Sequence, residues 1–320
     1  MTAETEKAYG FIGLGAMGYM MAKNLRRKTK VSDTIVIYDV CARTMDKFFK
    51  ENKESGKIVI AESAKDVVSR CSIIVTIVPE GKHVASVYDS EGDGALSVDI
   101  TGKIFIESST IDIATSIKVA SEVQNRGGNF IDCPVSGGTS NAEAGSITFM
   151  IGAEACDPNL DIVKPILETM GTNLIACGGP TRGLATKICN NYIAGTIAIA
   201  TAEGMNLAMR LGVNPKIFSE VVNVSTGASW VNSHCNPCPG IVPSAPASKG
   251  YAPGFRVELM KKDYNLAVDS AKEVGARLVL GPVGLQAYTE ASQDPNCVGL
   301  DSRVVYRFLG GDELWDKKGM

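Results

Sequence analysis

Glycines interrupt an apolar segment near the start of the chain, and an acidic residue ends the next apolar segment. The interrupted stretch reads Gly13, Leu14, Gly15, Ala16, Met17 and Gly18. Gly13 permits a tight turn, Gly15 lets the backbone approach a pyrophosphate, and Gly18 allows a helix to pack closely on a strand. Asp39 ends the following apolar run, where a carboxylate can bind ribose hydroxyls. The pattern predicts a dinucleotide site with the phosphates at a helix N-terminus.

Asp39 also bears on which dinucleotide is bound. A carboxylate at this place binds the ribose hydroxyls of NAD and repels the 2′-phosphate of NADP. Arg43 follows shortly after and carries a charge that could meet such a phosphate. Because the acid itself repels the phosphate, we expect NAD, with NADP the less favoured cofactor.

A lysine and an asparagine stand four residues apart after a second glycine-rich stretch. In a helix Lys187 and Asn191 lie on one face. The neighbouring apolar residues are Leu184, Ile188, Ile193 and Ala194. We therefore expect this face to be buried, although a lone helical lysine is ordinarily solvated. Burial lowers the pKa of a lysine toward neutrality, so this pair predicts acid–base chemistry.

Loops after two predicted strands offer further contacts to the cofactor. Val78 and Pro79 end one strand, and Thr110 follows another. The carboxyl ends of the strands form the ligand crevice of a doubly wound sheet, so we expect these residues near the nicotinamide. For Ser108 and Ser109, a contact to the cofactor and a plain turn or helix-cap role fit equally well.

A third loop follows the strand that ends at Asp132 and contains Ser136, Gly137 and Gly138. Consecutive glycines expose backbone N–H groups that can form a concave anion site. The loop is therefore a candidate site for a substrate carboxylate, with a plain glycine turn as the alternative.

The order of these segments predicts an α/β chain, in which a Rossmann-type doubly wound sheet is followed by an all-α C-terminal domain. We expect a dinucleotide-binding domain over residues 1–178 and an all-α substrate and oligomerisation domain over residues 179–320. Strands, about seven to nine in one sheet, are expected at Tyr9–Leu14, Ile35–Tyr38, Val59–Ala61, Ile73–Val78, Ile104–Glu107, Phe130–Asp132, Ile147–Ile151 and Asn173–Ala176.

Helices are expected where apolar residues recur with helical spacing. Ser63 is expected to cap one helix, and Ser109 or Thr110 the next. The others are predicted at Asp157–Met170, Thr181–Arg210, Pro215–Val224, Val257–Gly275, Pro282–Glu290 and Ser302–Leu309. Thr181–Arg210 is apolar all round, which predicts a buried spine between domains or subunits. Asn236–Pro253, rich in proline, is predicted to be an ordered loop or lid and not a domain linker.

Composition excludes several classes of function. Net charge is −3, and lysines and arginines do not cluster with aromatic residues, so a nucleic acid is not an expected partner. No apolar stretch is long enough to span a bilayer, and we expect no membrane partner. The nine cysteines indicate reduced thiols in an intracellular compartment. His234, Cys235 and Cys238 lack a second ligand pair, so no metal is expected.

Four blocks of the chain resemble, in order and spacing, the signature blocks of the β-hydroxyacid dehydrogenase family. They are Gly10–Leu25, Asp132–Gly138, Gly178–Asn191 and Leu259–Asp263. A fifth stretch, Asn236–Ala245, is similar to the branch that oxidises 3-hydroxyisobutyrate. The resemblance implies an NAD-dependent oxidation of a small 3-hydroxy carboxylate to a semialdehyde by direct hydride transfer.

The resemblance also implies roles for single residues. Lys187 matches the catalytic lysine and Asn191 its partner, while Lys262 matches a lysine that reaches the cofactor. Thr110 matches a contact to substrate and cofactor. The loop that matches the substrate-carboxylate site consists of Ser136, Gly137 and Gly138. His83 departs from the pattern, since the resembling enzymes usually have a small polar residue there, near the nicotinamide.

Other functions remain open on the sequence alone. Reductases of tartronate semialdehyde, glyoxylate or succinate semialdehyde would share every block. A non-catalytic NAD(P)-binding scaffold and an imine reductase are disfavoured because such relatives lack the lysine. The resemblance implies a homodimer or homotetramer and, for a eukaryotic source, the mitochondrial matrix. Met1–Ala8 is too acidic for a leader, which leaves the cytoplasm as the alternative.

Overall fold

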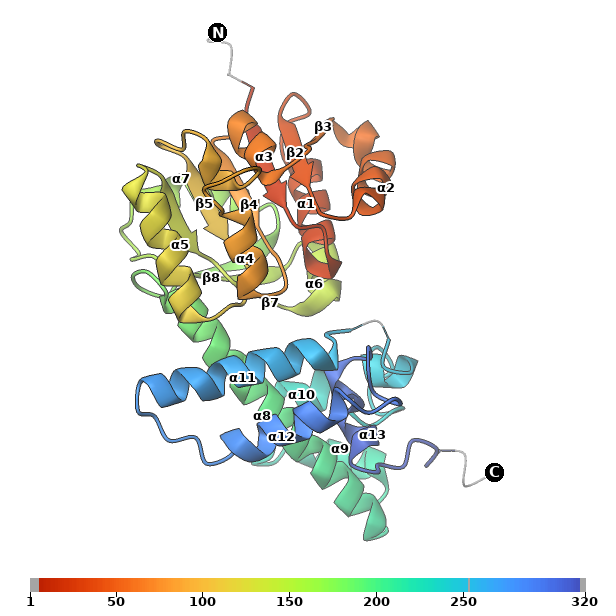
Figure 1. Cartoon of the computed structure of the whole chain (residues 1–320). Helices are drawn as coiled ribbons and strands as arrows, with labels where there is room; N and C mark the ends of the chain where they lie inside the picture. Colours follow the sequence, from red (N-terminus) through yellow and green to blue (C-terminus); the bar gives the residue numbers. More distant parts are fainter. Residues whose placement is uncertain (1–5, 253, 317–320) are drawn as a thin grey trace. The chain divides into compact units, whose positions relative to one another are not determined.

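The computed structural model describes residues 6–252 and 254–316 and divides them into two compact units (Figure 1). The first unit ends at Lys187 and the second begins at Ile188. The domain boundary between residues 178 and 179 stays a prediction. Residues 1–5 of the acidic N-terminal segment, which is predicted not to be a leader, and Pro253, the last residue of the predicted loop, lie outside the described residues.

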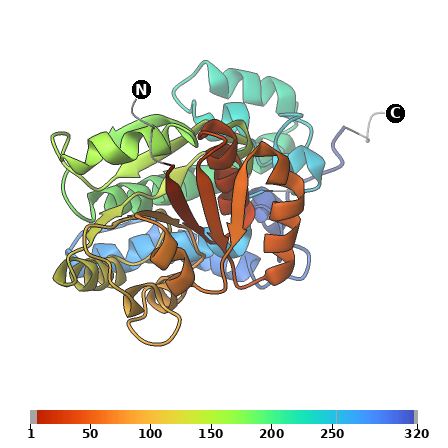
Figure 2. The same cartoon turned by 90° about the horizontal axis from the view of Figure 1, so that it is seen from above.

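Six parallel strands form the central sheet of the first unit. They are β1 (Ala8–Ile12), β2 (Thr34–Tyr38), β3 (Lys57–Ile60), β4 (Ile73–Thr76), β5 (Ile104–Glu107) and β6 (Asn129–Asp132). Their order is β3-β2-β1-β4-β5-β6, and Figure 2 shows the first of them side by side. The order reverses between β1 and β4, which creates the switch point where doubly wound sheets bind ligands.

Helices cover both faces of this sheet, as right-handed crossovers require. They are α1 (Ala16–Lys28), α2 (Ala42–Asn52), α3 (Ala64–Arg70), α4 (Gly81–Val87) and α5 (Ile113–Asn125), with 3-10 turns at Lys53–Ser55 and Ala95–Ser97. Ser63 caps α3 as predicted, accepting the Asp66 N–H at 3.1 Å. The cap of α5 is Asp112, which accepts the Thr115 N–H at 2.7 Å. The prediction of Ser109 or Thr110 was wrong because the chain stays extended until Asp112.

The expectation of one large sheet was also wrong. A separate sheet contains β7 (Val135–Ser136), β8 (Ile147–Ile151) and β9 (Gly171–Ala176), with β7 antiparallel and β9 parallel to β8. Pro134 follows β6 and has no N–H to continue the parallel ladder. The helices of this part are α6 (Gly138–Ala144) and α7 (Asn159–Leu167). Phe149 of β8 and Phe11 of β1 are fully buried in one hydrophobic core, so both sheets belong to the same unit.

The second unit is helical, and the fold class is confirmed. It contains most of α8 (Arg182–Arg210), then α9 (Pro215–Asn223), α10 (Trp230–His234), α11 (Val257–Glu273), α12 (Gly281–Ala291) and α13 (Val305–Phe308). Short 3-10 turns occupy Pro246–Lys249, inside the predicted loop, and Ser302–Val304. No helix among the described residues is long and apolar enough to cross a membrane. All nine cysteines are free thiols.

Helix α8 differs from the uniformly buried spine that its composition predicts. Ala198, Ala202 and Met205 are buried. Ile193 and Leu207, by contrast, are 56% and 59% exposed. The helix therefore has one packed face and one apolar face open to solvent in a single chain. Whether a second copy covers the open face stays a prediction.

Candidate active site

The first glycine stretch forms the turn between β1 and α1. Gly13 has φ +96°, and a Cβ there would lie 2.1 Å from the carbonyl oxygen of Ile77, so no other residue fits. Gly15, at the start of α1, is exposed, and a Cβ there would have no protein atom within 4 Å. The structure thus has a backbone cradle with open space at a helix N-terminus, the geometry that phosphates favour.

Asp39, directly after β2, holds this turn in place. Its Oδ2 accepts the Leu14 N–H at 2.6 Å, and its Oδ1 accepts the Cys41 N–H at 2.8 Å. A carboxylate oxygen can accept more than one hydrogen bond, so both atoms keep capacity for hydroxyl donors. Arg43 is exposed in the first turn of α2.

The loops after β4 and β5 are joined to each other. The Val78 N–H donates to Ser109 Oγ at 2.8 Å, and the Ser109 N–H donates to Glu107 Oε1 at 2.9 Å. Ser109 therefore fastens two loops, and it does not cap a helix. Thr110 is half-buried beside it, and Pro79 is exposed at the sheet edge.

The third loop lies between β7 and α6. Gly137 and Gly138 both have positive φ, +133° and +69°, a pair of conformations that side chains disfavour. Both are exposed, and a Cβ on Gly138 would have no protein atom within 4 Å. Asn24 of α1 donates to the carbonyl oxygen of Ala142 at 2.7 Å and so fixes the far end of α6. Gly137 and Gly138 thus leave the loop backbone open to solvent, and the helix that follows is fastened to α1.

Lys187 and Asn191 lie one turn apart on α8. They are 8% and 6% exposed, and their neighbours Leu184 and Ile188 are buried. Ile193, predicted to share this setting, is exposed, because it lies on the other side of the helix.

Asp263 of α11 orders the polar groups of the second unit. Its Oδ2 accepts the Nδ2–H of Asn191 at 2.6 Å, and its Oδ1 lies 2.9 Å from the Lys262 ammonium. This bond orients the Asn191 amide with its NH₂ group toward Asp263. The second hydrogen of that NH₂ group can donate to a further acceptor. Sequence reasoning gave Asp263 no role, although the acid directly after Lys262 was a visible signal.

The two histidines have unlike surroundings. His83 of α4 is half-buried, and its Nδ1 has no hydrogen-bond partner among the described residues. The ring of His234 stacks on Trp230 at 5.3 Å, and its Nδ1 lies 2.7 Å from Ser233 Oγ. Among the residues that the structure describes, no three His, Cys, Asp or Glu side chains gather as a metal site.

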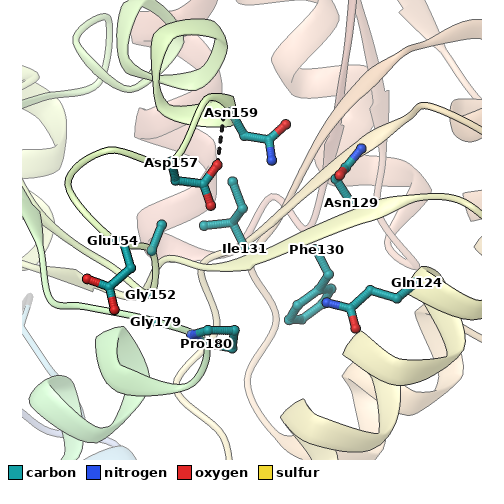
Figure 3. Close-up of a pocket in the computed structure, with 11 residues that line it drawn as sticks. Gln124, Asn129, Phe130, Ile131, Gly152, Glu154, Asp157, Asn159, Gly179 and Pro180 are labelled. Carbon is teal, nitrogen blue, oxygen red and sulfur yellow. Dashed lines mark hydrogen bonds between the residues drawn. The ribbon is translucent and has the colours of Figure 1, made fainter.

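A small pocket of about 160 Å³ lies at the amino end of β6, beside Gly179 and Pro180 (Figure 3). None of the predicted site residues lines it. Its acidic side chains, Glu154 and Asp157, are exposed and half-buried respectively, and Asp157 accepts the Asn159 N–H at 2.8 Å. The pocket is therefore separate from the glycine turn and its cradle.

Known families match both parts of the chain. The one described as the NAD binding domain of 6-phosphogluconate dehydrogenase matches residues 8–179. The one described as NAD-binding of NADP-dependent 3-hydroxyisobutyrate dehydrogenase matches residues 181–309. The probable mitochondrial 3-hydroxyisobutyrate dehydrogenase of Dictyostelium discoideum is 40% identical over 97% of this chain and 92% of its own.

The chain belongs to the 3-hydroxyisobutyrate dehydrogenase family. It is an NAD(P)-dependent oxidoreductase of that type. The NAD-dependent L-serine dehydrogenase of Pseudomonas aeruginosa is 34% identical over 88% of this chain and 91% of its own. The structure of Mycobacterium tuberculosis 3-hydroxyisobutyrate dehydrogenase with L-serine superimposes with a TM-score of 0.84 at 30% identity, covering 95% of this chain and 99% of that one.

The residues of the first unit fit the cofactor of this family. The open space at Gly15 leaves room for a pyrophosphate at the first N–H groups of α1. Asp39 lies next to this turn, where the ribose hydroxyls of an NAD(P) molecule are bound in Rossmann folds. Any side chain at position 15 would occupy part of this space, so the fit of the pyrophosphate depends on Gly15.

Glu107 is a buried acid that sequence reasoning missed. It is 2% exposed, its Oε1 accepts the Ser109 N–H, and its Oε2 has no partner within the described part of the chain. Burial raises the pKa of Glu107 from 4.5 to about 7, and interactions with Ser109 and Tyr88 counter this rise only in part. The folded chain therefore binds this proton more tightly than the unfolded chain, and stability falls as the pH rises through that range.

We expect Glu107→Gln to remove this pH dependence, because glutamine keeps an acceptor for Ser109 and does not titrate. Between about pH 5 and pH 8 the native protein should lose roughly 2 to 3 kcal/mol of unfolding free energy relative to the variant. Thermal melts at several pH values measure this, with the exposed Glu91→Gln as control. Parallel pH profiles for native protein and Glu107→Gln would contradict the expectation.

Proposed function

We propose that the protein oxidises 3-hydroxyisobutyrate to methylmalonate semialdehyde with NAD as the hydride acceptor, a step of valine degradation. The observation that carries the proposal is the buried Lys187, one turn from an asparagine whose amide is oriented by Asp263. It is supported by relatives named for this activity at about 40% identity.

The loop of Ser136, Gly137 and Gly138 is proposed to bind the substrate carboxylate. Gly137 and Gly138 are exposed and have positive φ angles, and successive N–H groups in such a turn can form a concave anion site. Charge-assisted bonds from N–H groups hold a carboxylate in one orientation. Thr110, at the end of β5, is proposed to contact both substrate and cofactor. These contacts would fix the position of the substrate carboxylate and, through it, the position of the carbon that bears the hydroxyl group.

Lys187 and Asn191 are proposed to act on the substrate hydroxyl. A bound nicotinamide would supply the acceptor for the hydride of the carbinol carbon. As that hydride leaves, the hydroxyl proton passes to Lys187 Nζ, and the remaining Nδ2–H of Asn191 donates to the oxygen. In the reverse direction the lysine ammonium returns the proton to the carbonyl oxygen. Proton and hydride leave from the same alcohol, so charge balances.

Asp39 is proposed to select NAD. Its carboxylate already accepts two backbone N–H groups and is fixed in place beside the turn. A fixed negative charge there favours ribose hydroxyls over a 2′-phosphate. Further cofactor contacts are proposed for Val78, Pro79, His83 and Lys262.

L-Serine is a second candidate substrate, since one relative is named for it and one similar structure was solved with it. L-Serine and 3-hydroxyisobutyrate share a primary alcohol and a carboxylate and differ at the middle carbon, which has an ammonium or a methyl group. The mitochondrial matrix is the proposed compartment, and the relatives named as mitochondrial support a mitochondrial location. A homodimer or homotetramer remains the proposed assembly.

A substrate panel with both cofactors tests the proposal. We expect the highest kcat/KM with 3-hydroxyisobutyrate and NAD, lower values with L-serine, and lower values again with NADP. The reduced forms of tartronate semialdehyde, glyoxylate and succinate semialdehyde complete the panel. A higher kcat/KM for L-serine than for 3-hydroxyisobutyrate would overturn the substrate, and a preference for NADP would overturn the role of Asp39.

Gly138→Ala tests the carboxylate loop. Its methyl group would enter the open space at φ +69°, so we expect KM for the acid to rise about tenfold while cofactor affinity is kept. The matched control is Gly102→Ala, because Gly102 also has positive φ, +73°, and open space, but lies in the turn before β5, at the amino edge of the central sheet. Both should cost about 1 kcal/mol of stability. Equal KM values for the two variants would remove the loop from the substrate site.

Lys187→Ala and Lys187→Arg test the acid–base role. We expect folded proteins that bind NAD normally and turn over at least about a hundredfold more slowly, because arginine keeps the charge but does not release a proton. The exposed neighbour Thr186→Ala is the control. The measurements are kcat, NAD affinity and thermal midpoint on one preparation. Near-normal turnover of folded Lys187→Ala would exclude the lysine and point to His83.

A further inference from the structure

Asp132, the last residue of β6, lies 4% exposed at the carboxyl edge of the central sheet. Its Oδ1 accepts the Thr181 N–H at 2.8 Å, and its Oδ2 accepts the Leu184 N–H at 2.8 Å. Thr181 directly precedes α8 and Leu184 lies in its first turn, about fifty residues later in the chain but within the same unit. One carboxylate therefore joins the sheet to the first turn of this helix.

The first turn of α8 depends on this carboxylate for its backbone hydrogen bonds. A helix leaves its first N–H groups without intrahelical acceptors. Here the Arg182 N–H donates to the carbonyl oxygen of Gly179 at 3.2 Å, and Asp132 accepts from Leu184. Burial raises the pKa of Asp132, and the N–H groups of the helix turn oppose that rise. The negative charge also lies at the positive end of the helix dipole.

The surrounding backbone is shaped around the same carboxylate. A Cβ on Gly152 would lie 1.9 Å from Asp132 Oδ1, and one on Gly183 would lie 3.0 Å from Oδ2. Thr181 has φ +67°, a left-handed conformation that costs a threonine about 1 to 2 kcal/mol. The bond to Asp132 keeps the Thr181 N–H turned toward the sheet. The close approach of Gly152 and Gly183 to the carboxylate and the strained backbone of Thr181 therefore restrict how far the start of α8 can move.

We propose that Asp132 is a positioning residue for Lys187, which fixes the start of α8 so that the lysine points to one place relative to the glycine turn and the Ser136–Gly138 loop. Lys187 follows Leu184 by less than one helical turn, so a shift or rotation of the first turn moves its side chain directly. The inference rests on the acid–base role proposed above for Lys187. Displacement of a catalytic group by about 1 Å can cost a hundredfold in rate.

A double-mutant cycle tests the proposal. Asp132→Asn keeps one acceptor but turns an NH₂ group toward the other N–H. We expect kcat to fall about tenfold to a hundredfold, with cofactor dissociation constant and KM for the acid changed by less than about threefold. In the Lys187→Ala background the same change should lower kcat by less than about twofold, because the group it positions is gone. Amide hydrogen exchange should show weaker protection of Leu184.

Asp33→Asn is the matched control. Asp33 is also buried and accepts a backbone N–H, that of Lys7 at 3.1 Å, but at the amino edge of the sheet. We expect it to lower the thermal midpoint and to leave kcat unchanged. If Asp132→Asn does not fold, Gly152→Ala displaces the carboxylate by a methyl group alone and enters the same cycle.

The outcomes separate the two proposals. Normal kcat of folded Lys187→Ala removes the acid–base role itself. A large loss for Lys187→Ala with normal kcat for Asp132→Asn, or losses that simply multiply in the double variant, overturn the positioning role alone. A non-additive loss confined to kcat supports it.

Discussion

Carboxylates at the ends of parallel strands hold the loops of the first unit in place. Asp39 follows β2, Glu107 ends β5 and Asp132 ends β6, and each accepts a backbone N–H from a loop or helix start. Loops at the carboxyl edge of a sheet have few backbone partners of their own, because the ladder stops there. An acidic side chain supplies the missing acceptor. The cofactor turn, the loops after β4 and β5, and the start of α8 all depend on this arrangement.

These three acids differ in what their burial costs. Asp39 is half-buried and can accept further hydrogen bonds, whereas Glu107 and Asp132 are almost fully enclosed. A buried carboxylate lowers stability unless hydrogen bonds replace its lost water. Asp132 has two close N–H donors, while Glu107 leaves one oxygen without a partner among the described residues. The protein thus retains one acid whose burial is only partly compensated, at the end of β5 and three residues before Thr110.

The sequence predicted the glycine turn, Asp39 and the long helix because each depends on local chemistry. A turn that requires a positive φ is visible in the sequence as a glycine, and a helix is visible as a periodic spacing of apolar residues. It did not predict Asp263, Glu107 or the role of Asp132, since their partners lie far away in the chain or are backbone groups that carry no residue signature. The split into two sheets was missed for a similar reason. The strands were recognised, but their pairing is set by the turn at Pro134 and by packing of α6 on α1.

Helix α8 begins in the first unit and continues into the second, with Lys187 and Asn191 on either side of the division. Their separation is one helical repeat and does not depend on how the units are arranged. For protein engineering this means that the two residues are inherited together only if the helix stays whole. A chimera of two relatives joined between Lys187 and Ile188 would take the lysine from one parent and the asparagine, with its Asp263 partner, from the other. A junction before Thr181 takes both residues from the same parent. It then combines Asp132 of one parent with the helix start of the other, to which Asp132 must hydrogen-bond.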